Sequence, residues 1–188
     1  MKQIDIRFTS SDIDAIQGMI GKKMLEYKCD PFEYSTSVYG IVGICLEDAS
    51  YAFTNFTEVM DYYGEQEDVS HFKLEHISYK DIHSFVQGQT MIETPVESMI
   101  SEVIVVNERQ QLFKNDKQIY EVLLTRGIIF KFEDGRELSF EKNIWFSEDI
   151  SVERGYDLIE RFTPTTEFVE GWSDEYRGEC SREFISVK

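Results

Sequence analysis

Alternation of apolar and polar residues is the commonest pattern along this chain, and it predicts strands. At the start, Ile4, Ile6 and Phe8 alternate with charged residues. A period of two is typical of a strand with one buried face. We therefore expect a short first strand over Gln3–Phe8.

The next segment has helical spacing instead. Its apolar residues fall on one stripe, formed by Ile13, Ile16, Ile20, Met24 and Tyr27. Ser10 or Ser11 can cap the start of this helix, and acidic residues in its first turn suit the helix macrodipole. We expect an amphipathic N-terminal helix that packs on a sheet.

Beyond Pro31 the pattern returns to strands. We predict an acidic loop over Asp61–Asp68 and a tight turn at Asp134–Gly135, since an Asp-Gly pair between alternating apolar residues is a strong hairpin signal. The predicted strands are Ser37–Leu46, Tyr51–Phe56, His71–Ile77, Val86–Ile92, Ile100–Phe113, Gln118–Phe132, Ile144–Phe146, Tyr156–Phe162 and Cys180–Val187.

These elements predict an α+β fold that is mainly antiparallel β, with the N-terminal helix packed on the sheet. A curled sheet or partly open barrel is expected, because a long meander must curl or cover its edges. The length of 188 residues predicts a single domain over 1–188.

A weak internal similarity raises the hypothesis of a duplicated β-hairpin. A shift of 86 residues places Tyr34 on Tyr120, Glu47 on Glu133 and Asp48 on Asp134. The chain would then have pseudo-symmetric halves, 1–94 and 95–188. The alternative is that any two strand–turn–strand segments align in this way, because apolar alternation repeats by itself.

The net charge of the chain limits the classes of partner that we expect it to bind. Thirty-six acidic residues face 19 basic ones, which gives a formal net charge of -17. This balance disfavours nucleic acid and anionic membrane surfaces, because phosphates are neutralised by Lys and Arg. No apolar run approaches the roughly 18 residues of a membrane span. Three cysteines without a C-x-x-C pair, and no secretory signal, make the cytoplasm the expected location.

The acidic residues are interleaved with aromatics. From Cys29 to Phe72 there is no Lys or Arg. The expected function is a non-catalytic interaction domain that binds a basic protein, since aromatics supply contact area and carboxylates steer a cationic partner. The alternative is a solvated acidic face, and a homo-oligomer through an open sheet edge is a further option. The candidate partner-binding residues are Asp61, Tyr62, Tyr63, Glu65, Glu67 and Asp68.

A rival hypothesis is a small-molecule or carbohydrate-binding protein, or a hydrolase that uses paired carboxylates. Trp145 and Trp172 lie beside acidic residues, and aromatic rings stack on flat ligands, although a Trp after a strand more often fills a core. A flat acidic patch would favour the first hypothesis, and a concave pocket with convergent polar groups would favour the second.

Signals for catalysis or a cofactor are weak. The three histidines, His71, His76 and His83, have spacings that match no metal pattern. Cys45 and Cys180 lack the surroundings of a nucleophile. Phosphate-loop, dinucleotide-loop, nucleophile-elbow and zinc-protease motifs are absent. We therefore expect no cofactor and no metal site, and the sequence singles out no catalytic residue.

Overall fold

The computed structural model describes residues 1–143 and 147–188. It is mostly antiparallel β-sheet with few helices, and the sheet is not closed. The helices are α1 (Ser10–Gln17) and α2 (Thr166–Glu170), with short 3-10 turns at Tyr79–Asp81 and Leu158–Arg161. The strands are β1 (Lys2–Ile6), β2 (Lys23–Cys29), β3 (Ser37–Tyr39), β4 (Ile41–Leu46), β5 (Ser50–Tyr62), β6 (Glu65–His76), β7 (Ile92–Lys114), β8 (Lys117–Phe132), β9 (Glu137–Lys142), β10 (Asp149–Gly155) and β11 (Tyr176–Val187).

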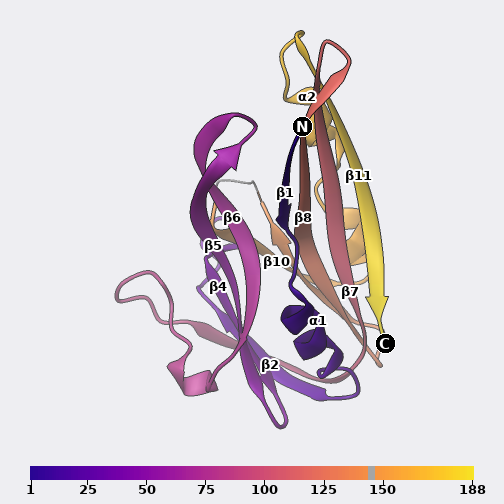
Figure 1. Cartoon of the computed structure of the whole chain (residues 1–188). Coiled ribbons are helices and arrows are strands. Elements are labelled where there is room, and N and C mark those ends of the chain that lie inside the picture. The colour runs from indigo at the N-terminus through magenta and orange to yellow at the C-terminus, as the bar shows by residue number, and fades with distance from the viewer. Residues whose placement is uncertain (144–146) are drawn as a thin grey trace.

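The strands form two layers that share β7 (Figure 1). Residues 92–99 of β7 pair with β2, which continues through β4 and β5 to β6. Residues 100–114 pair with β8, which continues through β9 and β10 to β3. In the layer that contains β8, β11 also pairs with β7, and β1 runs parallel to β8. The layer that contains β8 is called layer one from here on, and the layer that contains β5 is called layer two.

The core lies between the layers. Phe53 of layer two packs on Phe140 of layer one with ring centroids 5.1 Å apart, and Phe72 lies 4.6 Å from Phe53. Both layers supply aromatic and branched residues to one buried cluster. The packing of the two layers explains the alternation of apolar and polar residues in the sequence, because each strand turns one face inward and the other to solvent or to a covering segment.

The N-terminal helix is shorter than the apolar stripe predicted, and its cap is different. Thr9, not Ser10 or Ser11, caps α1 in a capping box with Asp12. The other oxygen of Asp12 accepts the backbone N–H of Leu74 at 3.0 Å, and Ile16 is fully buried. The helix ends before Gly18, and Gly21 turns the chain with a φ of 75°. Met24 and Tyr27 are therefore buried residues of β2.

Two predicted segments differ from the structure at glycines whose backbone lies in the left-handed region. Ser37–Leu46 is not one strand, because Gly40 has a φ of 69° under the ring of Phe85 and separates β3 from β4. Asp61–Asp68 is not a loop. It is the tip of the β5–β6 hairpin, where Tyr63 and Gly64 have φ values of 54° and 99° and make a two-residue turn.

Other predictions have mixed outcomes. The Asp134–Gly135 hairpin is confirmed between β8 and β9, and the C-terminal strand is confirmed as β11. The strand predicted over Val86–Ile92 is wrong, because only its last residue begins β7. The strand predicted over Tyr156–Phe162 is also wrong, since this segment holds a 3-10 turn. The predicted Ile144–Phe146 strand lies outside the described residues.

The two segments of the proposed duplication are both hairpins, β4–β5 and β8–β9. Their neighbours differ, because β4 pairs with β2 whereas β8 pairs with β7 and β1. The midpoint at residues 94 and 95 falls inside β7. The duplication stays a prediction.

The helices of the described ranges are all too short or too polar to cross a lipid bilayer.

Close packing at Gly127 of β8 yields the first testable prediction. A Cβ at this position would lie 2.4 Å from the carbonyl oxygen of Phe140 and 2.7 Å from the ring of Phe162. We expect Gly127→Ala to lower the free energy of unfolding by about 1–3 kcal/mol, because backbone cannot yield as a flexible side chain does. Urea unfolding followed by circular dichroism measures the loss.

Gly18→Ala is the matched control, because its added Cβ would meet nothing closer than 3.4 Å and Gly18 has ordinary helical dihedrals. Equal urea midpoints for the two variants would contradict the packing described for Gly127.

Candidate functional site

A pocket of about 470 Å³ lies where the tip of the β5–β6 hairpin meets layer one and the α2 segment. Its wall therefore comes from five separate parts of the chain. The lining residues are Tyr62, Tyr63, Glu65, Glu67, Gln110, Leu124, Arg126, Lys142, Asn143, Glu167, Phe168, Gly171 and Trp172.

The hairpin tip is tied to layer one by Asp61. Its carboxylate accepts hydrogen bonds from the Tyr120 hydroxyl at 2.9 Å and from the backbone N–H of Gly64 at 3.1 Å. Lys2 of β1 lies 2.7 Å away and, as the strongest influence, lowers the pKa of Asp61. These contacts hold the turn in place and so fix one wall of the pocket.

Aromatic rings form the second wall. The ring centroid of Tyr63 lies 5.0 Å from that of Trp172 and 5.7 Å from that of Phe168. Trp172 packs closely on Gly178 of β11, where a Cβ would come within 2.7 Å of the indole. The absence of a side chain at residue 178 therefore sets how deeply Trp172 sits. The rings of Tyr63 and Trp172 meet edge to face, and the backbone of Tyr63 lies in the left-handed region.

Tyrosine hydroxyls and an amide form the next layer of the pocket. The hydroxyls of Tyr62 and Tyr63 both donate to Oε1 of Gln110, at 3.1 and 3.2 Å. Burial raises the pKa of each tyrosine, so both remain protonated donors. The side-chain amide of Gln110 donates in turn to Glu108 at 3.2 Å.

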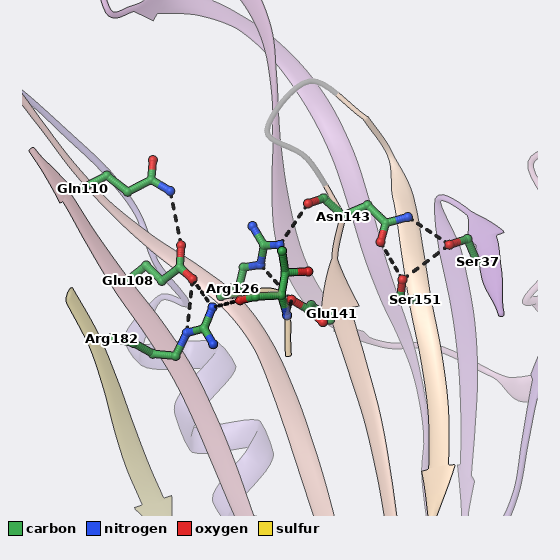
Figure 2. A network of polar contacts seen from close by, with 9 residues as sticks. Ser37, Glu108, Gln110, Arg126, Glu141, Asn143, Ser151 and Arg182 are labelled. Carbon is green, nitrogen blue, oxygen red and sulfur yellow. Dashed lines mark hydrogen bonds and ion pairs between the residues drawn. The ribbon is translucent and has the colours of Figure 1, made fainter. Parts of the chain in front are cut away.

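Two buried ion pairs continue this network across the sheet (Figure 2). Arg182 donates to Glu108 through Nε at 3.1 Å, and Arg126 donates to Glu141 through Nε at 3.0 Å. The backbone of Thr163 joins the two pairs, because its carbonyl accepts from Arg182 and its N–H donates to Glu141. Such pairs are costly to desolvate unless every donor and acceptor is satisfied.

The far end of the network reaches β3. Arg126 donates to the carbonyl of Asn143 at 3.0 Å, and the Asn143 side chain bonds to Ser151 and Ser37 (Figure 2). Asn143, which directly follows β9, is thus held by Arg126 on one side and by Ser151 and Ser37 on the other.

Lys142 is the exception in this buried region. Its side chain lines the pocket and is only 1% exposed, and its Nζ donates to the backbone carbonyl of Ser70. Within the described ranges, no carboxylate forms an ion pair with it. Burial, followed by repulsion from Arg126, lowers the pKa of Lys142 to about 7, and Glu108 opposes this shift.

The structure places the six predicted partner-binding residues in three settings. Tyr62, Tyr63, Glu65 and Glu67 line the pocket, and Tyr62 is only 3% exposed. Asp61 is engaged with β1 and β8. Asp68 is exposed on β6.

Two tryptophans and one cysteine were considered as further candidates in the sequence. Trp172 lines the pocket, whereas Trp145 lies outside the described residues. Burial raises the pKa of Cys180 to about 12, with Glu108 acting in the same direction, so its thiol is a poor nucleophile at neutral pH.

Sequence reasoning missed Gln110, Arg126 and Lys142. One signal for Lys142 was present, because it continues the alternation of Leu138 and Phe140 and so falls on the apolar face of its strand. A lysine in such a position is either an edge residue or a buried functional group.

Comparison with protein-family models, with curated proteins and with solved structures finds no match for this chain. The residues of the described ranges contain no group of three or more His, Cys, Asp or Glu side chains placed to hold a metal ion.

The buried amine of Lys142 predicts a specific pH dependence of stability. The pKa of this group is about 7 in the folded chain and 10.5 ordinarily. Between these values the unfolded chain holds a proton that the folded chain lacks, so stability rises with pH across this window and the penalty is constant below it. Lys142→Met removes the effect.

We expect Lys142→Met to be more stable than the wild type at pH 7. Its advantage should shrink as pH rises from 7 to 10, by at most roughly 1.4 kcal/mol per pH unit. Urea unfolding at a series of pH values measures this difference. Lys73→Met, at an exposed position of the same protein, should show a difference that does not change with pH. A constant difference for both variants would show that Lys142 is not buried as a neutral amine.

Proposed function

We propose that this protein binds a small polar ligand with a flat ring in the pocket at the β5–β6 tip. The observation that supports this most strongly is the joining of a ring-lined wall, made by Tyr63, Phe168 and Trp172, to a floor of buried polar groups. Small-molecule sites combine mostly apolar walls with a few placed polar groups, and a volume of about 470 Å³ lies in their usual range.

The chemistry of the wall favours a cyclic polar compound, such as a sugar or another ring that carries hydroxyl groups. Aromatic faces stack on flat rings, while Glu65, Glu67 and Glu167 offer acceptors for hydroxyl or amine hydrogens. This corresponds to the rival hypothesis of the sequence analysis, with Trp172 as the stacking residue.

The buried charges beside the pocket support the same proposal. Burying two ion pairs, and a lysine that has no carboxylate partner among the described residues, costs free energy, since apolar residues of the same volume would be as stable or more so. Perturbed ionisable groups that gather beside a pocket are typical of functional sites.

A ring-binding pocket predicts loss of binding when its aromatic wall is removed. A set of neutral one- and two-ring fragments, including monosaccharides, is screened by ligand-observed NMR. We expect fragments that bind the wild type to lose at least about tenfold in affinity with Trp172→Ala, because stacking contacts supply a few kcal/mol of binding.

Tyr34→Ala is the matched control, since Tyr34 is a fully exposed aromatic that does not line the pocket. Fragments should bind this variant as they bind the wild type. If no fragment binds, or if both variants bind equally well, the pocket is not the ligand site.

A second candidate is the binding of a basic protein at the hairpin tip. The observation that favours it is the exposure of Glu65 and Asp68, neither of which has an ion-pair partner in the part of the chain that the structure describes. Unpaired carboxylates on a protruding hairpin attract cationic surfaces and speed association.

The basic-partner proposal predicts binding that depends on salt and on the hairpin tip. Glu65→Lys with Asp68→Lys should abolish capture of a basic partner from native cytosol, and moderate salt should weaken it. Affinity capture with mass spectrometry measures both effects. The control is Glu33→Lys with Glu160→Lys, which makes the same change of charge at exposed residues outside the hairpin and the pocket lining. Partners that are retained by both double variants would argue against this surface.

A further inference from the structure

Lys142 differs from the other pocket residues in a combination of three features. It lines the pocket, it is almost wholly buried, and its recorded partner is the backbone carbonyl of Ser70. The arginines nearby are both committed to carboxylates, Arg126 to Glu141 and Arg182 to Glu108. The structure therefore stabilises those two cations and leaves the amine of Lys142 without a counter-ion among the described residues.

We propose that Lys142 is a nucleophilic amine that captures a neutral, ring-bearing carbonyl compound in this pocket as an imine. This inference rests on the proposed function, because it takes the pocket as the ligand site and names the reactive group of the ligand.

The surroundings of Lys142 favour the uncharged, nucleophilic form of the amine. Arg126 faces it from β8, and His71 faces it from β6 with a pKa that burial and then Lys142 lower. Glu108 on β7 attracts the protonated form, but its carboxylate already accepts from Arg182 and Gln110. A desolvated lysine beside another cation is the usual arrangement of an imine-forming residue.

The step needs no oxidant or reductant. The nitrogen lone pair of Lys142 adds to the carbonyl carbon, a C–N bond forms, and the carbonyl oxygen takes up a proton as the nitrogen loses one. The resulting carbinolamine then loses its hydroxyl group and the second nitrogen hydrogen as water. The product is a C=N bond that joins the ligand to the side chain.

The charges around the pocket select the class of carbonyl compound. Glu65, Glu67 and Glu167 line the same cavity and repel an anionic ligand. Arg126 lies beside Lys142 and repels a cationic one. The ring wall requires a flat face. A neutral aromatic aldehyde, or a ketone that carries a ring, satisfies all three conditions.

Reductive trapping tests this proposal directly. The folded protein is incubated with benzaldehyde and sodium cyanoborohydride, and the modified lysines are located by peptide mass spectrometry. We expect Lys142 to be labelled at least about tenfold faster than exposed Lys73, although Lys142 is the more buried. Its labelling should increase as pH rises through 7, because only the neutral amine reacts.

The comparison between two lysines of one wild-type molecule does not depend on the folding of any variant. Lys142→Met, which removes the amine without adding a buried charge, should lose the fast label and keep the slow one. Labelling of Lys142 no faster than that of Lys73 would overturn the inference.

The two proposals fail in different ways. If fragments bind in the NMR screen and Lys142 is not preferentially labelled, the imine is wrong and the ring-binding pocket stands. If Lys142 is labelled quickly and this labelling is unchanged in Trp172→Ala, the amine is nucleophilic but the aromatic wall does not guide its ligand, which contradicts the ring requirement.

Discussion

The continuous strand β7 is the constraint on which the rest of the structure depends. Its 23 residues belong to both layers, with β2 alongside the first part and β8 and β11 alongside the second. The layers therefore cannot slide past each other without breaking hydrogen bonds along one backbone. The β5–β6 hairpin, which is three strands away from β7, reaches back to layer one through Asp61. The pocket lies where the tip of this hairpin contacts layer one.

Burial of the ion pairs at the pocket costs desolvation free energy, and this cost is offset because each of their charged groups has a hydrogen-bond partner. Glu108, Glu141 and both arginines have partners at hydrogen-bond distance, and Thr163 links the two ion pairs through its backbone. Buried pairs of this kind add little net stability, but the loss of one member leaves a charge uncompensated. The geometry is therefore held in one arrangement, as a binding site requires. Lys142 has no such ion pair among the described residues, and its burial lowers its pKa to about 7 at a cost in stability.

The mainly antiparallel β character and several elements of this protein could be predicted from sequence, whereas the site could be predicted only in part. Alternation revealed the β-rich character, and Asp134–Gly135 revealed a hairpin, because both are local signals. Tyr63 was expected in a loop because it lies in an acidic stretch. Its left-handed backbone and its aromatic neighbours from distant segments have no local signal in the sequence. The convergence of Gln110, Arg126 and Trp172 depends on pairing across the sheet, which spacing along one chain does not encode.

The pairing of β1 with β8 has a consequence for how the chain reaches its native state. Lys2 lies opposite Tyr120, and Ile6 lies opposite Leu124, in a parallel ladder that no local turn can close. During synthesis, β1 must wait for more than half of the chain before its ladder partner exists. Contacts so distant in sequence slow folding. The backbone groups of β1 that form this ladder therefore stay unpaired by β8 until late in synthesis, and an unpaired strand favours association with other chains.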